Sequence, residues 1–517
     1  MMDMKATKKK LGIKERYAHM TRGLGWEPTY QPADAVFPYD KYEGIKIHDW
    51  DKWVDPFRLT MDAYWKYQGE KDRKLYAVID AFAQNNGHLN ITDARYLSAI
   101  KLFWQGVSPL ENYVVQGFAR AGRHFRGEAS RVACQMQAVD ELRHYQTQAH
   151  SISNYNKYYN GFHSQRHMWD RVWYLSVPKS FGEDALTAGP FEFLIAISFS
   201  FEYVLTNLLF VPFMSGAAYN GDMSTVTFGF SAQSDESRHM TLGIEAIKFL
   251  LEQDPANVPI VQGWIDKWFW RGSKVLALVG MMMDYMLPKR VMSWKEAWEI
   301  YAEENGGALF RDLARYGIRP PKGWADACEA KDHISHQVWL LFYEYGGAAA
   351  FHTWSLTNEE LDWLSAKYPD SFDKYYRPRL EFLRDKHARG ERVYQSTLPT
   401  LCTTCQIPLC FTEPGDPTKI SHRETVYEDE KYVFCSVHCQ EIFCNEPEKF
   451  VQSWLPVNQI YQGNCFNPDV DPTAPDFDPL KAVLEYFKYN LGRDNGEFEG
   501  SEDQRNFAMW RGQASKN

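Results

Sequence analysis

Two pentapeptides of this chain share the pattern Asp-Glu-x-Arg-His, at residues 140–144 and 235–239. In an α-helix, residues three positions apart lie on the same face. Each pentapeptide would therefore present one carboxylate and one imidazole to the same side, from Glu141 with His144 and from Glu236 with His239. A single copy could equally be a surface ion pair, but two copies that share four of five residues indicate a metal site built from two helices.

Two further carboxylates complete a possible ligand set. Glu111 lies 30 positions before Glu141, and Glu202 lies 34 positions before Glu236. Separations of this size suit a helix, a turn and a returning helix. A Glu, a Glu-x-x-His, a second Glu and a second Glu-x-x-His on four helices match the ferritin-like bundles that hold two iron or manganese ions. Four carboxylates and two imidazoles suit these metals.

The surroundings of Glu202 also indicate a strong partner for its carboxylate. Residues 193–213 are almost entirely apolar and come close to the length of a membrane span, with Glu202 near the middle. A carboxylate at the centre of a bilayer is costly, so we expect a buried helix and no membrane. An ionised Glu in so apolar a setting needs a metal or another cation nearby.

The Asp and Arg of each pentapeptide have a supporting role in this interpretation. A metal-bound imidazole usually donates its second ring N–H to an acceptor, and Asp140 and Asp235 are the natural acceptors. Arg143 and Arg238 could pair with these carboxylates and balance their charge. The alternative is that these four residues form ordinary surface salt bridges.

Apolar residues recur every three or four positions from about residue 92 to 350, which predicts long helices. We expect helices over 97–125, 130–155, 190–214, 225–251 and 261–285. The predicted fold is mainly α, with a ferritin-like di-iron helical bundle at its core, extra helices and a small cysteine-rich zinc module. The predicted domains are an N-terminal extension or subunit interface over 1–91, the bundle over 92–350 and peripheral helices over 351–397. The zinc module over 398–455 and a C-terminal tail over 456–517 follow.

Seven of the nine cysteines fall between Cys402 and Cys465. Within this stretch, one Cys-x-x-Cys pair is followed 30 positions later by a second close pair, which suits tetrahedral zinc. The expected ligands are Cys402, Cys405, Cys435 and Cys439. His438 could replace one thiolate, although a ligand directly beside Cys439 is geometrically awkward.

Two other interpretations of the cysteines are weaker. A disulfide-stapled module is disfavoured because we expect a reducing cytoplasm, and a redox-active pair lacks the usual βαβ context. The spare cysteines, Cys410, Cys444 and Cys465, are expected to be buried apolar residues.

The net charge and the N-terminal segment argue against nucleic-acid binding and against secretion. The formal net charge is −10, which disfavours nucleic-acid binding because neutralising phosphates needs clustered Lys and Arg. The basic N-terminal segment lacks the apolar run of a secretory signal, so the expected location is cytoplasmic.

With these motifs in place, the chain resembles the large (alpha) subunit of a bacterial multicomponent monooxygenase hydroxylase, in the phenol hydroxylase branch. The resemblance implies that Glu111, Glu141 and His144 hold one iron and that Glu202, Glu236 and His239 hold the other, with Glu141 bridging both. Thr206 matches an active-site Thr near the oxygen site, while Asn207 and Gln233 match polar residues that respond to a regulatory protein. Positions that line an aromatic substrate pocket are matched by Val107, Phe181, Phe201 and Phe210.

The same resemblance implies a reaction and a set of partners. Electrons from NADH and dioxygen would convert phenol and methylphenols to catechols, and the ligands implied are two irons and one zinc. The chain shows no flavin, NAD or plant-type iron–sulfur motif, so a separate NADH-dependent flavin and iron–sulfur reductase would supply electrons. The family assembles as α2β2γ2 with beta and gamma subunits and a small regulatory protein.

Three alternatives stay open from the sequence. A toluene or benzene monooxygenase hydroxylase differs from a phenol hydroxylase only in substrate. A ribonucleotide reductase radical subunit or a desaturase would use the same metals, but Tyr145 would point about 100° away from His144 on a helix. A non-catalytic iron-storage or assembly protein would need no aromatic pocket.

Overall fold

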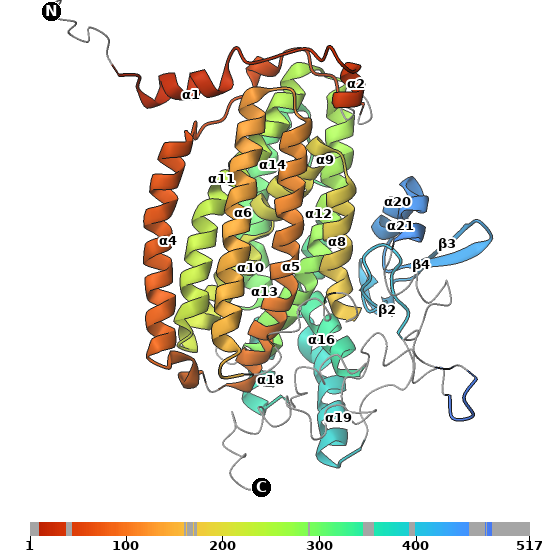
Figure 1. Ribbon diagram of the computed structural model, residues 1–517. Helices are drawn as coiled ribbons and strands as arrows, with labels where there is room; N and C mark the ends of the chain where they lie inside the picture. Colours follow the sequence, from red (N-terminus) through yellow and green to blue (C-terminus); the bar gives the residue numbers. More distant parts are fainter. Residues whose placement is uncertain are drawn as a thin grey trace, which may run out of the picture.

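Long helices that run side by side form the body of the molecule (Figure 1). The computed structural model of the chain describes residues 10–37, 44–91, 93–159, 162, 169, 173–287, 290–344, 356–391, 399–453, 471 and 473–477. The five longest helices of these ranges are α4 (Met61–Gln84), α5 (Ala94–His124), α6 (Glu128–Tyr155), α11 (Met223–Gln253) and α12 (Asn257–Met281). The predicted mainly α fold is confirmed. The predicted boundary at residue 350 and nearly all of the predicted tail lie outside the described residues.

Local signals explain where the central helices begin and how they pair. The Asp93 carboxylate caps α5 by accepting hydrogen bonds from the backbone N–H groups of Arg95 and Tyr96, at 2.8 and 3.2 Å. Asp222 caps α11 in the same way through the N–H of Thr225, at 3.2 Å. Since only residues 125–127 separate α5 from α6, these helices return on each other as antiparallel neighbours.

The apolar segment after residue 190 differs from the single helix that we expected. It consists of α9 (Pro190–Leu194), the π-helix η4 (Ile195–Tyr203) and α10 (Asn207–Tyr219), and its two arms meet at 44°. The N–H of Val204 donates to the carbonyl of Phe199, five residues earlier, as in a π-helix. Among the described helices no single one has the length and apolar composition of a membrane span, whereas this bent pair satisfies both criteria.

The N-terminal part contributes a full helix to the bundle. We expected an extension with mixed signals over residues 1–91, but α4 packs lengthwise against α11 (Figure 1). The shorter elements here are α1 (Ile13–Thr21), α2 (Ala33–Val36), η1 (Trp50–Lys52) and η2 (Gly87–Asn90).

Further helices surround the bundle after residue 172. Among them α8 (Ser176–Thr187) contacts both α5 and α12. The others are η3 (Trp173–Leu175), η5 (Met282–Met286), α13 (Trp294–Ala297), η6 (Trp298–Gly306), α14 (Gly307–Leu313), η7 (Ala314–Tyr316), α15 (Trp324–Ala330), α16 (Ile334–Glu344), α18 (Asn358–Lys367), η8 (Phe372–Tyr376) and α19 (Arg377–Ala388).

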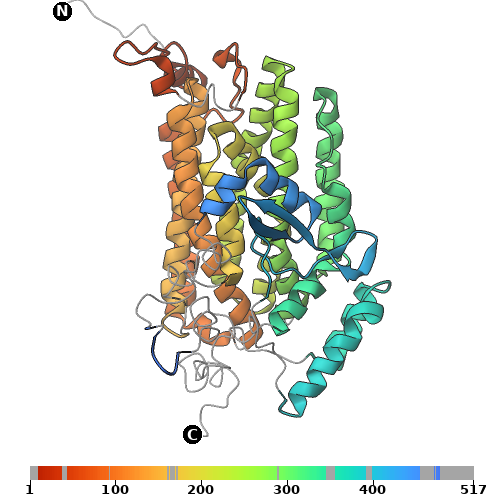
Figure 2. The same ribbon diagram turned by 90° about the vertical axis from the view of Figure 1, so that its right-hand side faces the viewer.

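A small module of two β-hairpins and two helices lies against one side of the bundle (Figure 2). Strand β1 (Thr412–Glu413) pairs with β2 (Asp416–Ile420), and β3 (Arg423–Tyr427) pairs with β4 (Glu430–Phe434), both antiparallel. Glu428 and Asp429 form the second hairpin's turn with φ of 50° and 65°, the pattern of a type I′ turn. Helices α20 (Val437–Asn445) and α21 (Pro447–Gln452) complete the module.

Candidate metal centre

The six predicted iron ligands converge inside the bundle, each from its expected segment. Glu111 comes from α5, Glu202 comes from η4, and the two Glu-x-x-His pairs come from α6 and α11. Their potential ligand atoms form two groups in which all atoms lie within 4.8 Å of one another. The groups are Glu111, Glu141 and His144, and Glu141, Glu202, Glu236 and His239. Glu141 belongs to both groups, which is the arrangement that its predicted bridging role requires.

The Nδ1 atom of each histidine faces three carboxylates. His239 Nδ1 lies 2.9 Å from Glu141 Oε1, 3.1 Å from Glu236 Oε2 and 3.6 Å from Glu202 Oε1. His144 Nδ1 lies 3.4 Å from Glu141 Oε2, 3.5 Å from Glu236 Oε1 and 3.9 Å from Glu111 Oε2. The two sides of the cluster thus have the same composition, and both have their nitrogen and oxygen donors directed inward.

Buried polar atoms without partners show that this cluster fits metal ions. Glu141 Oε1, Glu202 Oε2 and Glu236 Oε2, with both histidine Nδ1 atoms, have no hydrogen-bond partner among the described residues. Buried donors and acceptors are normally satisfied. Oxygen and imidazole donors in this proportion suit iron or manganese, which would satisfy all of these atoms together.

The electrostatics of the cluster favour added positive charge. Burial and the neighbouring Glu141 raise the pKa of Glu111 well above its usual range, and burial together with Glu236 raises the pKa of Glu202 to about 8. Burial opposes protonation of His144, yet its contacts with Asp235 and Glu141 raise its pKa to about 10. Four carboxylates in an apolar interior therefore attract cations, and divalent metals would meet this need.

The aspartate of each pentapeptide faces the histidine of the other pentapeptide. Asp235 Oδ2 lies 3.2 Å from Nε2 of His144, and Asp140 Oδ2 lies 3.6 Å from Nε2 of His239. Arg238 reaches both aspartates, at 2.5 and 2.7 Å. Arg143 does the same at 3.3 and 3.2 Å. These four side chains form one buried or nearly buried network and not the surface salt bridges of the alternative interpretation.

Helix α4 adds three residues to this network that sequence reasoning missed. Tyr64 donates to Asp140 at 2.7 Å, and Lys71 lies 2.7 Å from Asp235. The Gln68 amide nitrogen donates to both aspartates, at 2.8 Å each. Residues 64, 68 and 71 follow helical spacing, so a polar stripe on α4 was the signal available in the sequence.

An apolar cavity of about 110 Å³ lies beside the cluster, with Glu111, Glu141, Glu202 and Glu236 at its wall. Of the four predicted pocket residues, Val107, Phe201 and Phe210 line it. Phe181 is not a lining residue. It packs behind Phe201, with ring centroids 5.0 Å apart. The remaining wall is almost entirely aliphatic and aromatic, which suits a small apolar ligand.

The three predicted polar residues divide between two environments. Thr206 lines the cavity together with Glu202, although it lies beyond the end of η4 and not within a continuous helix. Its hydroxyl donates to the carbonyl of Phe201 at 3.1 Å. Asn207 and Gln233 do not line the cavity; they are half-buried and hydrogen-bonded to each other at 3.4 Å.

The four predicted zinc ligands also converge. Cys402, Cys405, Cys435 and Cys439 are buried with their sulfur atoms within 4.8 Å of one another. Cys435 Sγ lies 3.6 Å from the Sγ atoms of both Cys405 and Cys439. A disulfide needs about 2.05 Å, whereas a tetrahedron with zinc–sulfur bonds of about 2.3 Å has edges of about 3.8 Å. The geometry fits a four-thiolate metal site.

The neighbouring side chains refine the cysteine predictions. His438 turns away from the thiols, with Nε2 2.8 Å from Asp326 Oδ2. The prediction that Cys444 is buried is wrong, because it is exposed, and Cys410 is half-buried. Cys465 lies outside the described residues.

Sequence profiles of known families match two parts of the chain. The profile described as methane/phenol/alkene hydroxylase matches residues 26–254, which contain both iron-ligand motifs. A YHS domain profile matches residues 411–454, which contain the second cysteine pair.

Relatives extend this match to the whole chain. The oxygenase component DmpN of phenol 2-monooxygenase from Pseudomonas sp. (strain CF600) is 63% identical over 506 residues, covering 98% of this chain and 96% of the relative. The alpha subunit of the alkene monooxygenase oxygenase from Xanthobacter autotrophicus is 26% identical, covering 83% and 87%. The crystal structure of xenon-pressurised phenol hydroxylase from Pseudomonas sp. OX1 superposes with a TM-score of 0.89 at 63% identity, covering 97% of this chain and all of that chain.

Proposed function

The chain belongs to the methane/phenol/alkene hydroxylase family, and we propose that it hydroxylates phenol and methylphenols to catechols, with dioxygen and electrons from NADH. It is the oxygenase component of a multicomponent monooxygenase. Support for phenol comes from the identity of 63% with a phenol 2-monooxygenase component, against 26% with an alkene monooxygenase subunit. A toluene or benzene monooxygenase is the alternative within the family.

The observation that carries the proposal is the convergence of four carboxylates and two imidazoles at the wall of an apolar cavity. We assign Glu111, Glu141 and His144 to one iron, with Glu141 shared. The second iron is assigned to Glu202, Glu236 and His239. A carboxylate-bridged iron pair, when bound, supplies the activation of dioxygen.

The side chains around the cluster have four tasks in this proposal. Asp235 accepts a hydrogen bond from His144, and Asp140 faces His239 at 3.6 Å, so each carboxylate helps to orient one imidazole. Val107, Phe201 and Phe210 hold the aromatic ring and exclude water from the carboxylates. The Thr206 hydroxyl, on the same wall as Glu202, can hold or pass a proton there. We assign Asn207 and Gln233 to the response to a regulatory protein.

The cysteine cluster completes the set of cofactors. We propose that it binds one structural zinc, because four thiolates leave no open coordination position. No flavin or NAD site is assigned to this chain, so a separate flavin and iron–sulfur reductase supplies the electrons. We propose beta and gamma subunits in an α2β2γ2 assembly together with a small regulatory protein. A cytoplasmic location fits buried free thiols, since the cytosol keeps them reduced.

Single-turnover oxygenation tests the function. The purified oxygenase, assembled with its subunits and regulatory protein, is analysed for metals, chemically reduced and exposed to oxygen with phenol. We expect two irons and one zinc per chain, with catechol as product. Glu202→Ala should lose iron and form no catechol, while Glu359→Ala, an exposed residue of α18, should match the wild type.

Other outcomes would select the alternatives. Iron uptake without product would indicate storage. A persistent tyrosyl signal in electron paramagnetic resonance would indicate a radical subunit. Faster hydroxylation of toluene or benzene than of phenol would indicate the other substrate class.

A further inference from the structure

We propose that the cysteine module, residues 401–453, braces the wall of the substrate cavity, with Arg271 of α12 as the positioning residue. This inference rests on the proposed function for two points, a metal on the four cysteines and phenol in the cavity. It adds that the two sites are mechanically coupled through α12 and α8.

Helix α12 separates the module from the cavity. One face carries four residues of the cavity wall, namely Val275, Leu276, Leu278 and Val279. Another face contacts the module. The Lys274 ammonium lies 4.0 Å from the Trp270 ring and 4.3 Å from the ring of Phe411, a module residue. The Trp270 ring also lies 4.3 Å from the ring of His438. A shift of the module would therefore act on the helix that shapes the cavity.

Arg271 makes the most specific contact between the two parts. Its side chain is almost fully buried, at 1% exposure. One guanidinium nitrogen donates to the carbonyl of Thr404 at 2.5 Å. The other donates to the carbonyl and hydroxyl of Ser180 on α8, at 2.6 and 2.7 Å. The planar guanidinium thus joins α12, α8 and the module at one point.

Thr404 connects this point to the metal ligands. It lies within the Cys402–Cys405 loop, and its carbonyl also accepts a hydrogen bond from the Ser180 hydroxyl at 3.1 Å. Its own hydroxyl donates to the carbonyl of Cys439 at 2.7 Å. Thr404 is therefore bonded on one side to the second cysteine pair and on the other side to the bundle.

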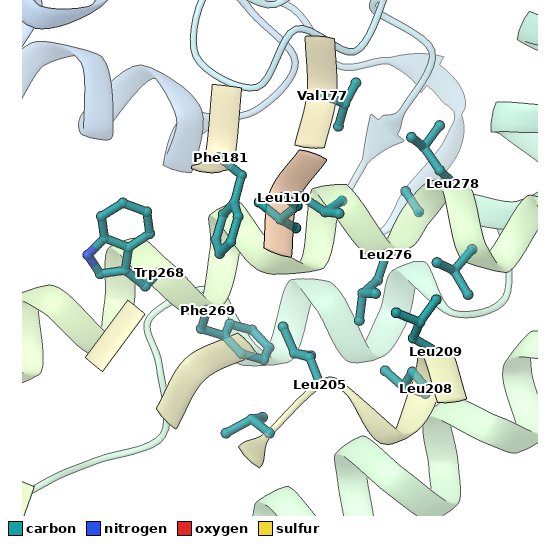
Figure 3. Packing of buried hydrophobic residues seen from close by; sticks show 14 of the residues in the cluster. Leu110, Val177, Phe181, Leu205, Leu208, Leu209, Trp268, Phe269, Leu276 and Leu278 are labelled. Carbon is teal, nitrogen blue, oxygen red and sulfur yellow. The ribbon is translucent and has the colours of Figure 1, made fainter. Parts of the chain in front are cut away.

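The contacts continue from this point to the cavity. Ser180 is followed by Phe181, which packs on the cavity residue Phe201, and Figure 3 shows Phe181 and Leu276 in the same apolar core. Arg271 is followed by Gly272, where an added Cβ would lie 2.9 Å from Leu205 and 3.4 Å from Phe201. The α12 backbone is thus in close contact with the cavity wall at the residue after the brace.

Because Arg271 is buried, its hydrogen bonds make the bundle sensitive to a displacement of the Cys402–Cys405 loop. A buried guanidinium that loses an acceptor pays the full desolvation cost of an unsatisfied charged group. If the metal no longer held the loop in place, Arg271 and Ser180 would have to move to find new partners. Close-packed interiors transmit such shifts, so the cavity wall would move with them.

Coupling of this kind is reciprocal for binding free energies. Phenol in the cavity should therefore strengthen metal binding by the cysteines, and a weakened brace should weaken phenol binding. In the assembled oxygenase, the transfer of metal from the cysteines to a chelator is followed with and without saturating phenol, and kcat and KM for phenol are measured. The variants are Arg271→Lys, which keeps the positive charge but loses the planar set of guanidinium N–H donors, and the milder Ser180→Ala. Arg290→Lys is the control, because Arg290 is also buried but lies against Trp363 and Glu360.

We expect phenol to slow metal release in the wild type and in Arg290→Lys. Arg271→Lys should release metal about tenfold faster, the factor expected for losing one hydrogen bond to a charged group. It should also lose the effect of phenol and raise KM more than it lowers kcat. Ser180→Ala should show the same changes at smaller size.

Two results would overturn the proposal. One is a wild-type release rate that phenol does not change. The other is faster release from Arg271→Lys with an unaltered KM for phenol. A wild-type protein without metal on its cysteines would refute the zinc assignment instead, and the KM of the Arg271 and Ser180 variants would then decide whether the brace exists.

Discussion

The carboxylate of Asp235 lies 3.2 Å from Nε2 of His144, a histidine of the other Asp-Glu-x-Arg-His motif. Asp140 faces His239 in the reciprocal way at 3.6 Å. Each aspartate is therefore adjacent in sequence to a candidate ligand on one side of the site while it faces the imidazole on the other side. The two halves of the candidate metal centre cannot be positioned independently of each other.

The pairing of Asp235 with a histidine of the other motif predicts the effect of Asp235→Asn. The amide cannot offer a carboxylate to His144. It also removes the carboxylate that Lys71 contacts and one of the carboxylates that Arg143 contacts. Metal affinity should fall by about 10- to 100-fold, as for other residues that support metal ligands. Iron retention against a chelator measures this. Asp312→Asn, at an exposed position of α14, is the control, and equal iron retention in both variants would contradict the prediction.

A second prediction concerns Gln68, whose single amide nitrogen donates to both aspartates. Gln68→Leu would leave one acceptor position of each buried carboxylate unsatisfied, at a cost of about 1 to 3 kcal/mol. We expect faster iron loss and lower stability to urea, with the polypeptide otherwise folded by circular dichroism. Gln116→Leu, at an exposed position of α5, controls for the change of residue type. The role of Gln68 would be refuted by unchanged iron loss.

The convergence of the candidate iron ligands was predictable because it depends on local periodicity. Residues i and i+3 share a helical face wherever the helix packs, so the two Glu-x-x-His pairs could be recognised from spacing alone. Glu111 and Glu202 followed from the lengths of the returning helices. The cysteine pairs were predictable for the same reason, since short spacings impose closeness in space.

What the sequence did not reveal depends on contacts between helices. Periodicity does not say which helix faces Asp140 and Asp235, so the exchange between the motifs and the contribution of Gln68 were not predicted. The π-helix before Thr206 was also missed, because the pattern of a mostly apolar segment does not distinguish an α-helix from a π-helix. Thr206 lies beyond the end of the π-helix that carries Glu202 and is the N-cap residue of the next helix, α10.

Cavity shape gives a third prediction. Val107 lines the cavity with Phe201 and Phe210, so Val107→Phe should fill space that a methyl-substituted ring needs. The ratio of kcat/KM for a methylphenol to that for phenol should fall by about tenfold or more, the range for one methyl-sized clash in an apolar pocket. Val78→Phe, at an exposed position of α4, should leave the ratio unchanged, and a ratio that rises in Val107→Phe would count against this assignment of the pocket.

The last prediction concerns Asp184, which is buried where α8 meets α12 and the cysteine module. Its carboxylate lies 3.3 Å from Lys267 and 3.4 Å from Arg271, and it contacts Lys449 of α21. Burial alone would raise the pKa of Asp184, but the charges of Lys267, Lys449 and Arg271 lower it below the usual value of 3.8. The ionised form is therefore stabilised in the folded protein.

The sign of the pH dependence follows from this shift. A carboxyl whose folded-state pKa is depressed contributes stability above its unfolded pKa, and that contribution is lost as pH falls below about 3.8. Asp184→Asn removes the contribution and takes one carboxylate partner from Lys267, Lys449 and Arg271, although Glu192 and Glu446 still face Lys267. Its urea midpoint at pH 7 should therefore drop by the equivalent of about 1.5 to 3 kcal/mol, the range for a hydrogen bond to a charged group. The difference in urea midpoint between Asp184→Asn and the wild type should become smaller as the pH falls below about 3.8. Asp370→Asn, an exposed residue, should follow the wild type at every pH, whereas a gap for Asp184→Asn that widens on acidification would show that its carboxylate is not the stabilising form.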